Sequence, residues 1–96
     1  MTLHELRATF KEAILSIAAR RGAGNVRVFG SVARGDNDQG SDIDFLVEME
    51  PGRTLFDLSA LLLDLQQLLA TRVDVVTERG LRPRIRERVL KEATLL

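Results

Sequence analysis

The sequence predicts a small α/β (α+β) domain, in which a three-stranded mixed sheet carries helices packed mainly on one face. Three short apolar runs have the patterning of strands, at residues 26–29, 42–49 and 72–77. Longer segments with apolar residues at helical intervals alternate with them, at residues 3–20, 55–69 and 83–93. A chain of 96 residues holds one modest core, so we expect residues 1–96 to form a single domain.

The composition excludes several classes of function. The formal net charge is zero, so bulk charge does not indicate a strongly basic nucleic-acid binder, and direct nucleic-acid binding is not expected. The absence of cysteine excludes a disulfide framework, a thiolate zinc site and a cysteine nucleophile. There is no signal peptide pattern and no apolar run near the ~20 residues that span a bilayer. We therefore expect a cytoplasmic protein without a membrane partner.

The first helix, over residues 3–20, has a recognisable start. Thr2 and Glu5 have the spacing of a capping box, in which each satisfies a backbone donor of the other. His4, the only histidine, falls in the first turn of this helix. It lies far in sequence from the acidic residues discussed below, so we expect it to be a surface residue and not a catalytic base.

The first strand leads into a turn suited to binding phosphate. Gly30 follows the strand and has no side chain, so backbone amides at this point can approach phosphate oxygens closely. Ser31 is expected to cap a short helical turn over residues 31–34 and to offer a hydroxyl. Free N–H groups at a helix start favour anions. Arg34 would contact a phosphate from this turn or, alternatively, form a salt bridge to Asp36 or Asp38.

The second strand places two carboxylates on one face. Asp42 and Asp44 are two residues apart, which in a strand means the same side and a separation of roughly 6.6 Å along the chain. Like charges held this way raise each other's proton affinity unless a cation lies between them. Hard oxygen ligands favour Mg²⁺ or Mn²⁺. The opposite face is apolar and should be buried; it comprises Ile43, Phe45, Val47 and Met49.

The helix over residues 55–69 is apolar on two sides. Thr54 is expected to cap it, and one stripe consists of Leu55, Leu58, Leu62, Leu65 and Leu69. The opposite side carries Phe56, Ala60 and Leu63. Such a helix is either sandwiched inside the domain or exposed for a partner.

The third strand supplies one more acid. Val73 and Val75 would face the core and Asp74 would point the other way, so Asp74 joins Asp42 and Asp44 if this strand lies beside theirs. The alternative is a buried acid paired with a nearby arginine, Arg72 or Arg79.

The last helix begins at Pro83 and is strongly basic. Six basic residues lie in this helix and its approach: Arg79, Arg82, Arg84, Arg86, Arg88 and Lys91. They form a solvated face or contact nucleotide phosphates, RNA or an acidic partner. The lack of tyrosine and tryptophan disfavours a dedicated RNA-binding face.

A family resemblance joins these motifs. Gly30-Ser31, ten intervening residues and Asp42-x-Asp44 resemble the signature of the DNA polymerase beta-like nucleotidyltransferase superfamily. The longer string GSVARG…GSDIDFLVE is most similar to its minimal nucleotidyltransferase branch, small prokaryotic proteins encoded beside a HEPN-domain partner. The resemblance implies the polymerase beta-like fold and Mg²⁺-dependent transfer of AMP from ATP to a hydroxyl. It further implies an antitoxin that modifies a tyrosine of a partner HEPN ribonuclease toxin.

The resemblance also assigns roles to residues. Asp42 and Asp44 would hold two Mg²⁺ ions, and Asp74 would complete the second metal site or act as the base. Gly30, Ser31 and Arg34 would bind the nucleotide. Two competing functions remain: a non-catalytic module that neutralises its partner by steric occlusion, and a small-molecule transferase of the aminoglycoside-modifying type. The latter normally needs an additional substrate domain, for which this chain has no room.

Overall fold

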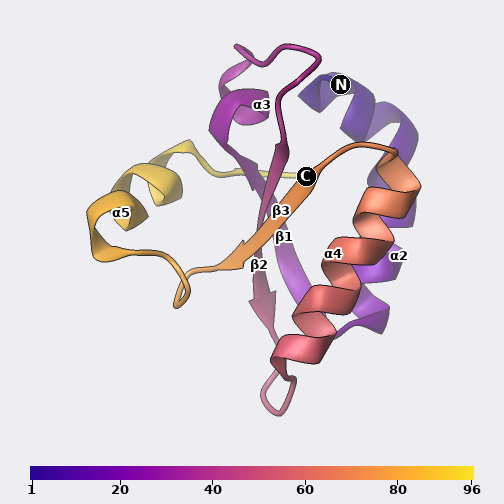
Figure 1. Cartoon of the computed structure of the whole chain (residues 1–96), viewed down its shortest axis with the longest axis vertical. Coiled ribbons are helices and arrows are strands. Elements are labelled where there is room, and N and C mark those ends of the chain that lie inside the picture. The colour runs from indigo at the N-terminus through magenta and orange to yellow at the C-terminus, as the bar shows by residue number, and fades with distance from the viewer.

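A computed structural model describes all 96 residues of the chain (Figure 1). The first helical segment is divided into α1 (Leu3–Glu5), a π-helical turn η1 (Leu6–Phe10) and α2 (Lys11–Arg20). The remaining elements are β1 (Ala23–Phe29), α3 (Gly30–Arg34), β2 (Ile43–Met49), α4 (Leu55–Leu69), β3 (Val73–Thr77), α5 (Pro83–Glu92) and β4 (Thr94–Leu95). No helix is long and apolar enough to cross a membrane.

The sheet has four strands, so the prediction of three is wrong. Its order is β3-β2-β1-β4, with β2 parallel to β3 and antiparallel to β1. The added strand, β4, consists of only two residues that pair antiparallel with β1. Two residues are too few to show the alternating pattern of a strand, which is why they were not expected. The mixed character of the sheet is as predicted.

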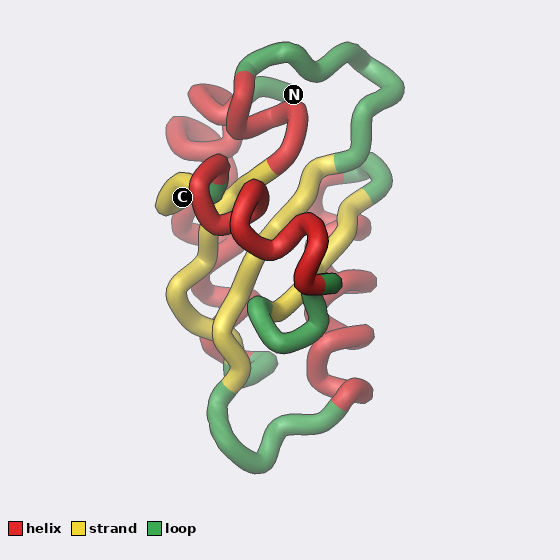
Figure 2. Tube along the Cα trace, turned by 90° about the vertical axis from the view of Figure 1, so that its left-hand side faces the viewer, coloured by secondary structure: helices red, strands yellow, loops and turns green.

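The helices lie on both faces of the sheet, with most on one. Helices α2 and α4 cover one face together with the N-terminal turns, and α5 lies across the other (Figures 1 and 2). The main core, of 17 buried residues, fills the space under α2 and α4 and includes the apolar face of β2. Under α5 a second cluster consists of Leu46, Leu81 and Val89. Leu46 therefore anchors α5 to the face of β2 that also carries Asp44.

The N-terminal half departs from the prediction in its details. Thr2 accepts the backbone N–H of Glu5 at 3.1 Å, which is one half of the predicted capping box, whereas the Glu5 carboxylate accepts the Thr2 hydroxyl at 3.3 Å in place of its N–H. The first strand begins earlier than expected, at Ala23, and its register with β2 shifts between Gly24 and Arg27. A bulge of this kind interrupts the alternation by which a strand is recognised. His4 is exposed, in agreement with a surface role.

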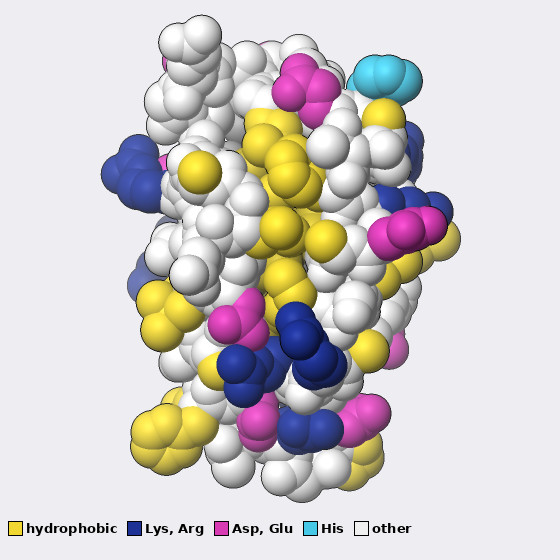
Figure 3. Space-filling model, turned by 90° about the vertical axis from the view of Figure 1, so that its right-hand side faces the viewer, with side chains coloured by type: hydrophobic (Ala, Val, Ile, Leu, Met, Phe, Trp, Pro, Cys, Tyr) yellow, Lys and Arg dark blue, Asp and Glu magenta, His cyan; other side chains and the backbone are white.

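Helix α4 has the predicted bounds, and four of the five residues of the predicted stripe, Leu58, Leu62, Leu65 and Leu69, belong to the core or pack against it. Leu61, which was not placed in the stripe, is completely buried, whereas Leu55 is 79% exposed. Phe56 and Leu63 are also exposed, at 87% and 63%. Figure 3 shows the molecule from the side of α2 and α4, with a band of apolar side chains and charged groups at its lower end. The two-sided apolar character of α4 therefore leaves large apolar side chains in contact with solvent.

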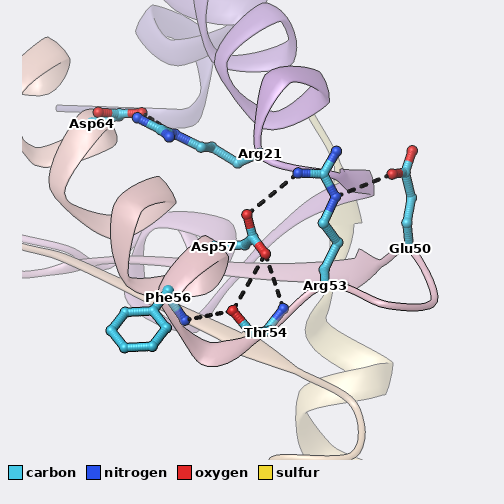
Figure 4. A network of polar contacts seen from close by, with 7 residues as sticks. All are labelled: Arg21, Glu50, Arg53, Thr54, Phe56, Asp57 and Asp64. Atoms are coloured by element: carbon cyan, nitrogen blue, oxygen red, sulfur yellow. Dashed lines mark hydrogen bonds and ion pairs between the residues drawn. The ribbon is translucent and has the colours of Figure 1, made fainter.

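The start of α4 is held by a polar network (Figure 4). The Thr54 hydroxyl accepts the N–H of Phe56 at 3.2 Å, and the Asp57 carboxylate accepts the N–H of Thr54 at 2.9 Å. Arg53 reaches both Asp57, at 3.3 Å, and Glu50, at 3.4 Å. These contacts confirm Thr54 as the cap and bring the backbone N–H groups of the first turn into hydrogen bonds.

Candidate active site

The predicted site residues lie at one end of the strands, where β1 ends and β2 and β3 begin. Phe29 pairs with Asp44 across the antiparallel ladder, and Asp44 pairs with Asp74 across the parallel ladder. Residues paired in this way project their side chains to the same face of the sheet. The condition stated for Asp74 is therefore met: its strand is the direct neighbour of the strand of Asp44.

Gly30 brings the backbone against the carboxylate of Asp44. Its φ is +72°, a conformation that other residues rarely adopt, and a Cβ atom here would overlap Oδ2 of Asp44. The need for glycine is thus set by Asp44 and by the left-handed backbone together. Helix α3 begins at Gly30 itself, so Ser31 lies within the helix and the expectation that Ser31 caps it is wrong.

Asp44 is in an unfavourable electrostatic environment. Partial burial and, to a smaller extent, the negative charges of Asp74 and Asp42 together raise the pKa of Asp44 to about 6. Arg34 acts in the opposite direction, whereas Glu92 adds to the increase in the pKa of Asp44. A carboxyl group in a cluster of like charges is a typical ligand for a cation, because the cation removes the repulsion.

Asp42 lies just outside the strand that was predicted to begin with it. Strand β2 starts at Ile43, and Asp42 is exposed and pairs with Arg72, with 3.0 Å between Oδ1 and Nε. Asp74 is exposed and takes part in none of the ion pairs, so the alternative of a buried acid paired with Arg72 or Arg79 is wrong. Of the three acids, only Asp42 forms an ion pair with a basic side chain.

Arg34 and Glu92 form a contact that sequence reasoning missed. The Arg34 guanidinium pairs with Asp36 at 3.1 Å, which was the predicted alternative, and also with Glu92 at 2.9 Å. Glu92 in turn accepts the backbone N–H of Gly30 at 3.3 Å. Glu92 is the last residue of α5, and no local pattern links it to Gly30. Only the folding of α5 back over the sheet brings the two together.

The donor set fits a divalent cation, although the side chains are not gathered around one. Asp44 and Asp74 lie side by side and Asp42 is close enough to raise the pKa of Asp44. Carboxylate oxygens are the ligands that hard divalent cations prefer. No group of three acidic or histidine side chains is close enough together to hold an ion as they stand. Asp42 would have to leave Arg72 to join the other two.

The basic residues of the last helix are all exposed. Two of them form ion pairs, Arg86 with Glu78 at 3.8 Å and Lys91 with Glu87 at 3.5 Å. The others have no acidic partner, so this face of α5 is solvated and positively charged. Its charge remains available to a phosphate or an acidic surface.

Comparison with known proteins decides what this arrangement represents. A family model described as the nucleotidyltransferase domain matches residues 9–96, which is most of the chain. The chain belongs to this family. This nucleotidyltransferase contains the expected sequence signature, Gly30-Ser31 followed by Asp42-x-Asp44. Its strands β2 and β3, which carry Asp44 and Asp74, pair side by side.

Relatives of this nucleotidyltransferase specify its branch. It is 34% identical to the protein adenylyltransferase MntA of Thermococcus cleftensis, over 96% of this chain and 93% of the relative. It is 39% identical to a provisionally assigned protein adenylyltransferase of Methanocaldococcus jannaschii, over 86% of this chain and 89% of the relative. Both alignments extend over nearly the whole length of each protein.

Solved structures agree with this placement. One carries the provisional description of a minimal nucleotidyltransferase; it has a TM-score of 0.86 and 58% identity, covering 100% of this chain and 97% of that chain. Another, a toxin–antitoxin complex with AMP-PNP, has a TM-score of 0.76 and 20% identity, covering 90% of this chain and 71% of that chain. The second likeness concerns the fold. Together these matches identify a minimal nucleotidyltransferase of the polymerase beta-like superfamily.

Proposed function

We propose that this nucleotidyltransferase is a protein adenylyltransferase that moves AMP from ATP onto a hydroxyl of a partner toxin and so acts as its antitoxin. The observation that carries the proposal is the pairing of Asp44 with Asp74 next to the backbone of Gly30. It sets acidic groups beside a backbone amide and an arginine. A nucleoside triphosphate, which is anionic and travels with a divalent cation, needs both kinds of group.

The residues divide the chemistry among themselves. Asp42, Asp44 and Asp74 would hold Mg²⁺, which supplies charge neutralisation at the phosphates and lowers the pKa of a bound hydroxyl. The Gly30 N–H and the Arg34 guanidinium would donate to phosphate oxygens, with the Ser31 hydroxyl beside them. The acceptor oxygen then forms a bond to the α-phosphorus, the bond from that phosphorus to the bridging oxygen breaks, and pyrophosphate leaves. Alternatively, Asp74, which is exposed, would accept the hydroxyl proton in place of binding the metal.

A protein acceptor is supported by two features. The curated relatives are named protein adenylyltransferases. In addition, Leu55, Phe56 and Leu63 leave an apolar surface on α4 that a protein could cover. We extend the proposal to a HEPN ribonuclease as the toxin and a tyrosine as the acceptor, as the sequence resemblance implies. The toxin–antitoxin complex among the structural neighbours is consistent with such a pair.

The test is transfer of label from α-labelled ATP to the protein encoded by the neighbouring gene, with Mg²⁺ present. We expect label on a tyrosine of the partner, and none with an Asp42→Asn, Asp44→Asn variant. Glu12→Gln, which changes an exposed acid on α2, is the matched control and should transfer normally. Label that stays on ATP while both proteins are folded would contradict the proposal.

Neutralisation by occlusion is the second candidate, and the exposed apolar residues of α4 favour it. The same double aspartate variant separates the two candidates when toxin activity is measured in place of label transfer. If the variant still silences the toxin at equal concentration, binding alone suffices. If toxin activity returns although the complex still forms, the transfer reaction is required.

A further inference from the structure

The carboxylate of Glu92 accepts hydrogen bonds from two of the groups proposed to bind the nucleotide. Glu92 accepts the N–H of Gly30 with Oε2 at 3.3 Å and pairs with Nη1 of Arg34 through Oε1 at 2.9 Å. Both donors are those assigned above to phosphate oxygens. A carboxylate and a phosphate present the same kind of atom to such donors, namely an anionic oxygen. We propose that Glu92 is an internal competitor that the phosphates of the nucleotide must displace.

Glu92 is held in an electrostatically unfavourable position, close to other acids, as expected of a group that the nucleotide can displace. Its side chain is only 19% exposed, and it lies near enough to the acidic cluster to raise the pKa of Asp44. A purely structural partner for Arg34 already exists in Asp36, at 3.1 Å and two residues further along the chain. Glu92 thus adds a negative charge to an acidic region without being needed to neutralise Arg34. Its contact with the Gly30 amide is one that the bound nucleotide would replace.

The fold lets the side chain leave without moving the helix. Helix α5 is anchored by Leu81 and Val89, both buried against Leu46. Glu92 is its last residue, and the chain turns at Ala93 into β4, which pairs with β1. Both flanks of Glu92 are therefore fixed, and rotation about its own side-chain bonds is enough to open the donors.

The consequence is a lowered affinity for every anion that uses these donors. When a binding-competent state is populated only in part, the apparent dissociation constant rises by the inverse of that fraction. If the Glu92 contact is formed nine times out of ten, its removal tightens binding about tenfold, or about 1.4 kcal/mol. The same competition would help pyrophosphate to leave after transfer, because Glu92 returns to the donors that pyrophosphate vacates.

The test measures nucleotide binding by the isolated chain, without partner or transfer. Glu92→Gln keeps an acceptor for the Gly30 amide but removes the charge, and Glu92→Ala removes both. Glu87→Gln is the matched control, since Glu87 is an exposed acid of the same helix that pairs only with Lys91. Binding of ATP with Mg²⁺, and of inorganic pyrophosphate without metal, is measured by calorimetry. The Gly30 amide is followed by NMR in the unaltered protein.

We expect about three- to thirty-fold tighter binding of both ligands to the two Glu92 variants, and no change for Glu87→Gln. In the unaltered protein, pyrophosphate should shift the Gly30 amide resonance. Equal or weaker binding by the folded Glu92 variants would overturn the inference, and weaker binding would make Glu92 a ligand or a positioning residue for Arg34. The inference rests on the proposed function but can fail separately from it. Equal binding refutes the competitor alone, whereas no ATP binding by any variant refutes both.

Discussion

The backbone of Gly30 lies directly against the carboxylate of Asp44, so that neither residue can be considered alone. A methyl group at Gly30 would overlap Oδ2 of Asp44, and the φ of Gly30, +72°, disfavours any side chain independently. The residue whose amide we propose to bind phosphate is therefore also the residue that lets Asp44 keep its position. The Gly-Ser motif and the Asp-x-Asp motif are thus in direct contact through Gly30 and Asp44.

Gly30→Ala should accordingly abolish nucleotide transfer and destabilise the fold. The left-handed backbone alone costs about 1–2 kcal/mol, and the displacement of Asp44 adds to this. Gly52→Ala is the matched control, because Gly52 has a φ of +87° but nothing within 4 Å of the added Cβ. It should lose stability without losing transfer. Denaturant unfolding and the labelled-ATP assay provide both readouts, and full activity in Gly30→Ala would contradict the close contact.

Asp44→Asn should stabilise the folded chain at neutral pH. The pKa of Asp44 is raised from 3.8 to about 6, so the folded protein binds a proton more readily than the unfolded chain between these values. The free energy of unfolding contributed by this group is therefore highest in acid and falls as the pH rises through this window. Because the carboxyl is partly solvated, we expect a gain of only about 1 kcal/mol in the variant.

The measurement for Asp44 is the difference in unfolding free energy between the two proteins from acid to neutral pH. This difference isolates Asp44 from carboxyls such as Asp57, whose pKa is lowered by the backbone N–H of Thr54 and whose contribution has the opposite sign. We expect the difference to vanish at low pH and to reach its full size at neutral pH. Mg²⁺ should raise the melting temperature of the original protein but not that of Asp44→Asn. A difference that does not change with pH would refute the electrostatic explanation.

Elements with a long and regular pattern could be predicted from the sequence almost to the residue. Helix α4 has the predicted bounds and β2 begins one residue later than predicted. The elements that differ from the prediction are those whose strand pairing is not reflected in the alternation of apolar and polar residues. Strand β1 contains a register shift, and β4 has only two residues whose pairing depends on β1. Such elements are stabilised by tertiary contacts that leave no periodic signal.

In the site, too, features set by local pattern could be predicted and features set by tertiary packing could not. Asp44 and Asp74 could be placed on one face from strand alternation, given only that their strands are neighbours. The buried face of α4 was predicted only in part, since Leu61 is buried and Leu55 is exposed, and leucines on several sides leave the exact orientation of the helix to packing. The contact of Glu92 with Gly30 joins residues far apart in the chain. It depends on where α5 docks, which is decided by Leu46 and not by any pattern around Glu92.

Thr54→Ala should destabilise the fold by about 1 kcal/mol, because it removes the hydroxyl that accepts the N–H of Phe56. The start of α4 lies at the opposite end of β2 from Asp44, so ATP binding should be unchanged (Figure 1). Thr9→Ala, at an exposed threonine without a side-chain hydrogen bond, is the control and should stay within about 0.5 kcal/mol. A loss of ATP affinity in Thr54→Ala at a temperature where it is folded would contradict this separation.

Phe56→Ser and Leu63→Ser should leave the isolated chain as stable as before and weaken its complex with the proposed toxin. Both side chains are more than half exposed, so little apolar burial is lost on substitution, and changes within about 0.5 kcal/mol are expected. Leu61→Ser is the contrasting variant: Leu61 is completely buried and its replacement should cost several-fold more. Unfolding curves and the dissociation rate of the complex are measured together. If the serine variants bind the toxin as tightly as the original chain, α4 does not contact it, and the toxin must be recognised elsewhere, with the basic face of α5 as the next surface to test.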